Sequence, residues 1–237
     1  MTTFPELLAL QAQDTAIDQL RHRRAHLDEQ AEVDAATNQL AAAQAEAAPV
    51  RAEVDALTAQ QRSLEDEAAT IEAKAAGVEA RLYDGSVVAH KELEDLQADH
   101  RSLKARQSNL EDAAIEVMEQ IEPHRAVLDG IEVRIAEISS TLADATERRD
   151  AALAVVDAEL EVDDARRAEL AAAVESSLLA TYEELRSRLG GVGAARLEGR
   201  RCMGCHIELP SADAQVIRGA PESDVVTCTE CGRILIR

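Results

Sequence analysis

The fold of this chain is decided by residues 82–93, Leu-Tyr-Asp-Gly-Ser-Val-Val-Ala-His-Lys-Glu-Leu. On either side, apolar residues recur at alternating spacings of three and four, from Val33 to Leu82 before this stretch and from Leu93 to Leu142 after it. Such a repeat keeps one narrow stripe of a helix turned towards a partner helix, as in a coiled coil. Because the stretch contains an Asp-Gly turn signal, the two stripes are expected to pair with each other. The sequence therefore predicts a long antiparallel helical hairpin with its tip at residues 83–91.

Two prolines inside the predicted arms, Pro49 and Pro123, suggest a register for the hairpin. Counting outward from Ser86 places them at the same level of the two arms. A proline inside a helix removes one hydrogen bond and kinks the axis. We therefore expect kinks at 49 and 123 that let both arms bend together. The same stripes would also fit a dimer in which the helices pair between two chains.

The composition favours a mainly α, elongated molecule over a compact one. The 237 residues are 46% hydrophobic, but they include one Phe, two Tyr and no Trp. A globular core of this size usually draws much of its buried area from aromatic side chains. Here the apolar residues are mostly alanine, leucine and valine, which suit narrow helical stripes.

The charge balance favours protein partners. The formal net charge is -21, and residues 190–237 hold six arginines and six acids, so the whole excess lies on residues 1–189. An acidic rod repels nucleic acids and membrane surfaces, although the charge also serves to keep a long exposed helix pair in solution. The N-terminus lacks the features of a signal peptide, and no window approaches the roughly 20 apolar residues of a membrane span. A cytoplasmic protein without membrane contact is expected.

The segment between the hairpin and the cysteines is predicted to form a small base domain at the open end of the hairpin. Asp163-Asp164 can cap a new helix, and the apolar positions change from Leu170 onwards. Gly190-Gly191 is a good stop for that helix. The chain is therefore expected to divide into a coiled-coil hairpin over 1–162, a third helix of the base over 163–191 and a zinc ribbon over 192–237. The third helix would cover an early stripe, Leu10 to Leu27, whose phase does not run into the hairpin.

All four cysteines fall in the last 36 residues, as two Cys-x-x-Cys pairs separated by 22 residues: Cys202, Cys205, Cys228 and Cys231. Each pair can present two thiolates to one tetrahedral ion, and cysteine-only ligation favours zinc. A redox dithiol would need a larger α/β domain around it, and disulfides are unusual in a cytoplasmic chain. The expected cofactor is one structural Zn²⁺. A closed four-cysteine site leaves no position for water, and no other catalytic motif is present, so neither an enzyme nor a small-molecule substrate is expected.

These motifs together resemble a bacterial family in which a long coiled-coil hairpin precedes a C-terminal four-cysteine zinc ribbon. The resemblance rests on the glycine turn followed by Lys91-Glu92-Leu93, on Tyr182-Glu183-Glu184-Leu185-Arg186 before the ribbon, and on both cysteine pairs. Family tips often have Asn-Pro where this chain has Ala89-His90. The resemblance implies the fold and the zinc. Some members are tied to flagellar gene regulation through a sigma factor and RNA, which implies a partner in the transcription machinery.

The favoured function is a non-catalytic adaptor or chaperone that binds a protein partner. The candidate partner-binding residues are those of the tip: Tyr83, Asp84, Val87, Val88, Lys91 and Glu92. Apolar residues at a tip often mark a contact surface. The alternative is that Tyr83, Val87 and Val88 pack against the neighbouring helical turns.

Two other functions remain open. A transcription factor could act on RNA polymerase through an acidic hairpin tip. The ribbon could bind nucleic acid directly, with Arg200, Arg201, Arg218 and Arg233 as candidate contacts. Only weak binding is expected from the ribbon, because it is formally neutral, four thiolates and one Zn²⁺ add negative charge, and it lacks aromatic residues for base stacking.

Overall fold

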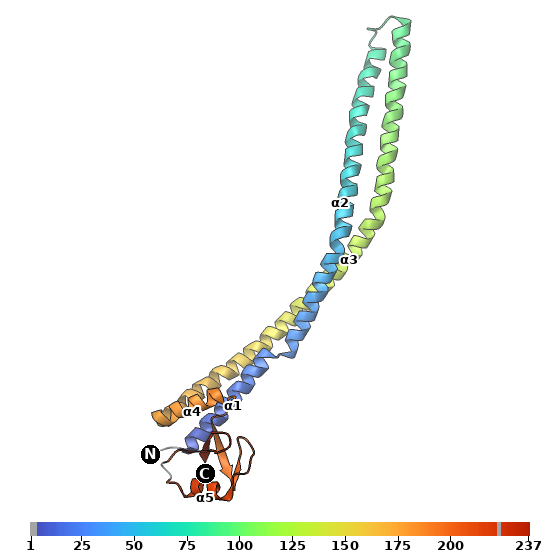
Figure 1. Ribbon diagram of the computed structural model, residues 1–237. Coiled ribbons are helices and arrows are strands. Elements are labelled where there is room, and N and C mark those ends of the chain that lie inside the picture. The colour runs from blue at the N-terminus through green and yellow to red at the C-terminus, as the bar shows by residue number, and fades with distance from the viewer. Residues whose placement is uncertain (1–3, 222–223) are drawn as a thin grey trace. The chain divides into compact units, whose positions relative to one another are not determined.

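The computed structural model describes residues 4–221 and 224–237 (Figure 1). The elements are, in order, α1 (Phe4–Ala25), α2 (Asp28–Tyr83), α3 (His90–Ala173), α4 (Ser176–Arg188), β1 (Ala194–Glu198), β2 (Arg201–Cys202), α5 (Ser211–Gly219), β3 (Val226–Thr227) and β4 (Ile234–Ile236). The predicted class, a mainly α chain with a helical hairpin and a small C-terminal β region, is confirmed. The chain forms two compact units, which we call the hairpin unit (Val33–Asp144) and the base unit (Met1–Glu32 with Ala145–Arg237).

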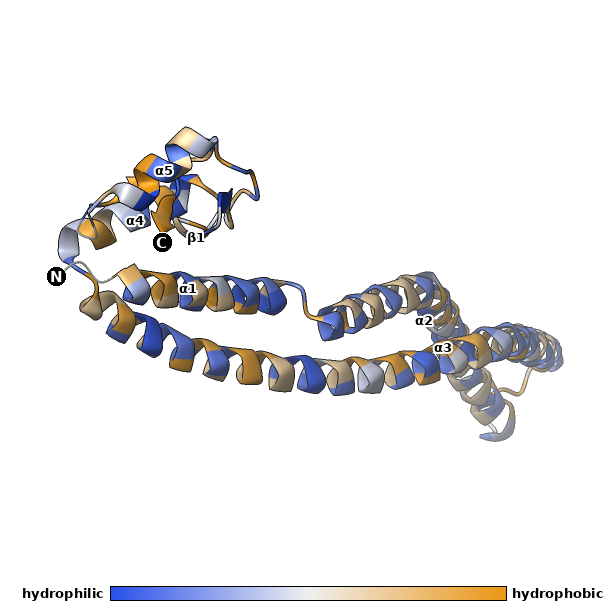
Figure 2. Ribbon diagram, turned by 90° about the horizontal axis from the view of Figure 1, so that it is seen from below, coloured by the Kyte–Doolittle hydropathy of each residue, from blue (hydrophilic) through white to orange (hydrophobic). Residues whose placement is uncertain are grey.

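In the hairpin unit, the later part of α2 runs antiparallel to the earlier part of α3 (Figure 1). Hydrophilic and hydrophobic residues alternate along both helices, as a narrow buried stripe requires (Figure 2). Leu57, Val117 and Ile121 form a small buried cluster with Leu64 beside it. Elsewhere the stripe is largely alanine, with Ala43, Ala47, Ala68 and Ala75 buried. The helices therefore pair through a thin seam of small side chains.

The register differs from the one that the prolines suggest. Arg134 donates a 2.5 Å hydrogen bond to Glu46, and Arg51 donates one of 2.7 Å to Glu132. These pairs place Pro49 opposite residues near 131, which is roughly two helical turns away from Pro123. The expectation that the two prolines share a level is wrong. It assumed that both helices end level at the tip, whereas α3 continues past the end of α2 and the six residues between Tyr83 and His90 bridge this offset (Figure 1). Both prolines lie inside continuous helices.

The third helix of the base begins later than the sequence indicates. Helix α3 continues through Asp163-Asp164 to Ala173, because the alanine-rich residues that follow favour helix. The break comes at Glu175, whose carboxylate accepts hydrogen bonds from the backbone N–H groups of Ser177 and Leu178 at the start of α4. A second break separates α1 from α2 after Ala25, within the interval where the early apolar stripe loses its phase.

The C-terminal strands form one small sheet with the order β2-β1-β4-β3. Strand β1 is parallel to β4, with Ala194 opposite Ile234, while the β1–β2 and β3–β4 pairs are antiparallel. Strands β1 and β2 are joined by a tight turn at Gly199, which has a φ of +60°. The two faces of the sheet enter different cores, since side chains alternate along a strand. One face joins the helices of the base, and the other covers α5 and the cysteines.

Candidate zinc centre and hairpin tip

The four cysteines converge at one end of the small sheet. Their Sγ atoms all lie within 4.8 Å of one another. The closest pairs across the two motifs are Cys202 with Cys231 at 3.9 Å and Cys205 with Cys228 at 4.0 Å. A tetrahedral zinc with Zn–S bonds of about 2.3 Å requires sulfur atoms about 3.8 Å apart. The thiols therefore fit one zinc ion with little movement, and the predicted structural zinc is confirmed as a C4 site.

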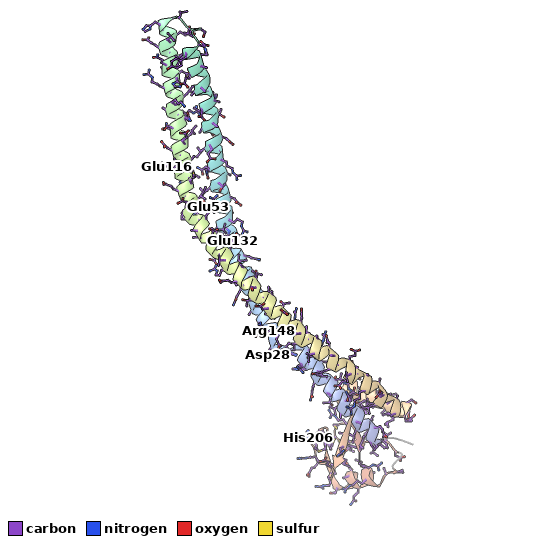
Figure 3. All side chains as sticks on the ribbon, turned by 180° about the vertical axis from the view of Figure 1, so that it is seen from behind. Asp28, Glu53, Glu116, Glu132, Arg148 and His206 are labelled. Atoms are coloured by element: carbon purple, nitrogen blue, oxygen red, sulfur yellow. The ribbon has the colours of Figure 1, made fainter. Side chains whose placement is uncertain are left out.

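Two similar backbone turns hold the cysteine pairs. His206 N–H donates to the Cys202 carbonyl at 2.7 Å, and Gly232 N–H donates to the Cys228 carbonyl at 2.9 Å. Both donors have positive φ angles, +62° for His206 and +76° for Gly232. His206 thus occupies in the first turn the place that glycine occupies in the second, and its side chain is exposed (Figure 3). Its position next to the cluster reflects this turn.

The electrostatics of the site suit a cation. Burial raises the pKa of the Cys202 thiol, and it raises the pKa of the Cys228 thiol to about 12. These groups stay protonated at neutral pH unless a cation stabilises the thiolates. Zinc supplies that charge when it binds, and four thiolates complete its coordination. The arrangement serves to fold the ribbon and leaves no open coordination position for a substrate.

The hairpin tip is an ordered turn. Asp84 accepts a 2.8 Å hydrogen bond from the backbone N–H of Ser86, and hydrogen bonding by the Ser86 side chain, together with this backbone bond, lowers the pKa of the Asp84 carboxyl. Gly85 takes a φ of +74°, which favours glycine. Helix α3 then begins with a hydrogen bond from Leu93 N–H to the Ala89 carbonyl. The short polar turn therefore fixes the path of the chain between α2 and α3.

The predicted tip residues are mostly exposed. Tyr83 is 82% exposed and Val88 is 93% exposed, so neither packs against the neighbouring helical turns. Val87 is half-buried, and Lys91 is exposed. Glu92 lies 3.7 Å from the guanidinium of Arg81, which partly neutralises the acidic side of the tip. The structure thus leaves two apolar side chains, those of Tyr83 and Val88, exposed on either side of the turn.

Three of the four candidate nucleic-acid arginines make internal contacts. Arg200 pairs with Glu208 and donates to Ser211, and Arg218 donates to the Ala214 carbonyl. Arg233 donates to the carbonyls of Val192 and Leu189. Among the four, and within the part of the chain that the structure describes, only Arg201 has an exposed side chain that makes no hydrogen bond or ion pair. The sequence does not reveal these contacts because most of their acceptors are backbone carbonyls.

The base unit contains a buried polar cluster that the sequence alone did not predict. Asp14 is 1% exposed, and it accepts 2.6 Å hydrogen bonds from Arg167 Nε and from the Tyr182 hydroxyl. Arg186 lies 3.4 Å from the same carboxylate and also donates to Asp18. Burial, followed by the hydrogen bond to Asp14, raises the pKa of Tyr182 well above its usual value. The sequence does contain one indication of a buried Asp14. This residue occupies a position of the apolar stripe, four residues after Leu10 and three before Ile17.

A second polar contact ties α1 to the start of the ribbon. The Gln11 side-chain oxygen accepts hydrogen bonds from Gly193 N–H at 2.7 Å and Ala194 N–H at 3.2 Å, and its nitrogen donates to the Gly191 carbonyl at 3.0 Å. Gln11 is buried. A single side chain thus satisfies three backbone groups of the linker that leads into β1.

Comparison with known proteins agrees with this architecture. Residues 10–190 match the model of the CT398-like coiled coil hairpin domain, and residues 201–235 match that of the C4-type zinc ribbon domain. The chain belongs to the CT398-like coiled-coil hairpin family. The family resemblance inferred from the sequence is thereby confirmed.

Relatives of known sequence and structure lie in several bacteria. The uncharacterized protein Rv2229c of Mycobacterium tuberculosis is 39% identical over 147 residues, which cover 62% of this chain and 60% of that protein. The chain thus spans about 60% of the length of this curated relative. A solved structure from Mycobacterium smegmatis has 32% identity and a TM-score of 0.83, with 98% of this chain and 96% of that chain covered. CT398 from Chlamydia trachomatis, at 19% identity and a TM-score of 0.67, covers 98% and 95% and shares the fold.

The helices of this family member are too polar to cross a bilayer. Over residues 4–221 and 224–237, none combines the length and the apolar character that a membrane span requires.

Proposed function

We propose that this chain is a non-catalytic adaptor that holds a protein partner at the tip of its coiled-coil hairpin. The observation that carries the proposal is the exposure of Tyr83 and Val88, at 82% and 93%, on an ordered turn. Exposed apolar side chains held in a fixed position offer a contact surface that loses little conformational entropy on binding. The resemblance of the chain to proteins tied to a sigma factor supports a partner in the transcription machinery.

The rest of the chain supports a binding role over a catalytic one. The zinc site is closed by four cysteines, which suits a structural ion. Exposed carboxylates such as Glu53 and Glu116 line both arms of the hairpin unit (Figure 3). Such a surface disfavours nucleic acid along the arms and favours a partner with basic or neutral contact residues.

The proposal is tested by capturing partners from a lysate of the host with the tagged chain. Val87 and Val88 are changed to Ser together, and the matched control changes Val127 and Val133, which are 54% and 59% exposed on α3, to Ser. The expected result is a protein that resists nuclease treatment, is lost with the tip variant and is kept with the control variant. A partner that survives the tip change, or the loss of every partner on nuclease treatment, would refute the tip adaptor.

A second candidate is an RNA polymerase factor that acts through an acidic tip. It is favoured by the Asp84 carboxylate, which the Ser86 hydrogen bond keeps ionised and fixed in orientation. Asp84→Asn preserves an oxygen that can accept this hydrogen bond and removes only the charge. If this variant abolished an effect on transcription while partner capture through Val88 persisted, the polymerase function would be preferred.

A further inference from the structure

We propose that zinc in the ribbon controls the docking of α1 and α4 in the base unit, so that the metal holds together helices that it does not touch. The first link is the strand that follows the second cysteine pair. Ile234 lies three residues after Cys231, and Ile234 and Ile236 are 0% and 5% exposed. They share a buried core with Leu7 and Leu10 of α1 and with Leu178 and Tyr182 of α4. Strand β4 therefore belongs to the ribbon and to the core of the base.

The second link is Arg233, two residues after the ligand Cys231. Its Nε donates to the Val192 carbonyl at 2.9 Å, and its terminal nitrogen donates to the Leu189 carbonyl at 3.1 Å. Leu189 is the C-cap of α4, where free carbonyls and the helix dipole favour a positive charge. The Arg233 side chain also packs on Gly204 between the first two cysteines, so closely that a Cβ there would lie 2.6 Å from Arg233 Cδ. One side chain thus joins both cysteine pairs to the end of α4.

The third link reaches α1 through the linker. Ile234 N–H donates to the Gly193 carbonyl at 2.9 Å, and Gly193 N–H donates to the Gln11 side chain at 2.7 Å. Gln11 and Leu10 lie side by side on α1, so the helix meets the ribbon through a polar and an apolar contact. If β4 unfolds, both contacts are lost.

The ribbon depends on zinc for its own folding. Its separate core contains the two buried cysteines and only six buried aliphatic residues, Ala195, Leu197, Leu209, Ala214, Ile217 and Leu235. A domain of this size rarely folds without a metal or disulfides. Loss of zinc should release β4 and Arg233 and thereby uncover the apolar faces of α1 and α4. The hairpin unit has its own buried cluster around Ile121 and should remain folded.

Hydrogen–deuterium exchange on the full chain tests this coupling. The zinc-bound protein is compared with protein stripped by a chelator under reducing conditions, and with stripped protein to which zinc has been returned. Amides of α1 and α4 should exchange at least about tenfold faster after stripping and recover with zinc, while those of residues 33–144 stay protected. Unchanged protection of α1 and α4 in the stripped protein would overturn the proposal.

A pair of variants tests the role of Arg233 in the coupling. Arg233→Met keeps an unbranched side chain over Gly204 but removes the hydrogen bonds to the Leu189 carbonyl at the end of α4 and to the Val192 carbonyl in the linker. Arg201→Met is the control, because Arg201 is exposed in the same ribbon. The first variant should keep one zinc per chain and show exchange about tenfold faster at the end of α4, whereas the control should match the wild type. Equal exchange in the two variants would show that Arg233 does not couple the ribbon to α4. If Arg233→Met lost its zinc, recovery of α4 protection on adding zinc would also count against a coupling role of Arg233.

Discussion

At the scale of single residues, the base unit depends on a buried carboxylate with several donors. Asp14 is surrounded by Arg167, Tyr182 and Arg186, which come from two other helices. Removing one partner of a buried charge pair commonly costs about 3–5 kcal/mol, because the remaining charge is left uncompensated. This cluster therefore fixes one specific packing of α1 against α3 and α4.

Tyr182 should make the base unit sensitive to alkaline pH. Burial and the hydrogen bond to Asp14 raise its pKa in the folded state, whereas in the unfolded state the phenol titrates near its usual value of about 10. The stability that the neutral phenol contributes is complete below pH 10 or so, and it is lost as the pH rises further because the unfolded chain releases the proton more readily.

The measurement uses Tyr83→Phe, which leaves Tyr182 as the sole tyrosine of the chain. Tyrosinate absorbance should stay low beyond the usual phenol pKa and then appear together with the loss of base structure. A smooth titration near pH 10 with the base still folded would contradict the buried position of Tyr182. Adding Tyr182→Phe to this variant should remove the dependence of base-unit stability on alkaline pH.

Gly193 should tolerate no side chain. A Cβ at this position would lie 2.7 Å from the Tyr182 carbonyl oxygen and 3.0 Å from the Arg186 nitrogen, both of which are backbone atoms. Gly193→Ala should therefore destabilise the base unit by about 1–3 kcal/mol. Gly77→Ala is the control, since no atom lies within 4 Å of its Cβ and alanine favours helix.

Thermal unfolding and limited proteolysis of the two glycine variants provide the comparison. Cleavage within α4 and the linker should accelerate in Gly193→Ala and stay at the wild-type rate in Gly77→Ala. Equal behaviour of the two variants would mean that the linker can move away from Tyr182.

Site residues differed in how well the sequence predicted them. The cysteine spacing predicted the zinc ligands because each Cys-x-x-Cys turn is local and both pairs serve one ion. The contacts of Asp14 were missed because its partners at 167, 182 and 186 are distant in sequence and have no shared spacing. Arg233 was assigned to nucleic acid on charge alone, whereas its structural contacts are to backbone carbonyls that a sequence does not display.

At the scale of elements, the hairpin is a long helix pair with a thin seam. Its apolar periodicity predicted both helices and their antiparallel pairing, since the 3-4 repeat and the Asp-Gly turn are local signals. The register was mispredicted because a seam of small alanine side chains specifies it weakly. Ion pairs such as Arg134–Glu46 form wherever long charged side chains can reach each other, and the apolar pattern does not indicate them. The start of α4 was mispredicted because Asp163-Asp164 is compatible with both a cap and a continuing helix.

The cluster around Ile121 should supply much of the stability of the hairpin unit. Ile121 is 1% exposed, whereas Ile115 on the same helix is 53% exposed. Ile121→Ala should cost about 2–5 kcal/mol through lost burial and the cavity left behind. Ile115→Ala should cost less than about 0.5 kcal/mol, as surface changes usually do.

Urea unfolding followed by circular dichroism compares the two isoleucine variants, since most of the helical signal comes from α2 and α3. Similar midpoints for the two variants would show that the seam around Ile121 is not the stabilising core. A dimer with helices paired between chains would also make the midpoint depend on protein concentration.

At the scale of the whole molecule, the chain combines two units with separate cores. The core of the hairpin unit is formed by its own helix seam, and the core of the base unit is formed by α1, α4 and the sheet of the ribbon. This division is compatible with both proposals, a protein partner bound at the tip and a base unit whose helices depend on zinc. It also means that variants in one unit serve as controls for the other.

The most direct test of a tip-bound partner places a photoreactive amino acid at position 88 and, in a separate protein, at position 162. Val88 is 93% exposed at the tip and Val162 is 67% exposed on α3 in the base unit, so both sites are accessible. A partner bound at the tip should give one strong cross-linked protein adduct from position 88 in the host, weakened by Val87→Ser, and none of that mass from position 162. An adduct from position 162 with none from position 88 would contradict a tip-bound partner.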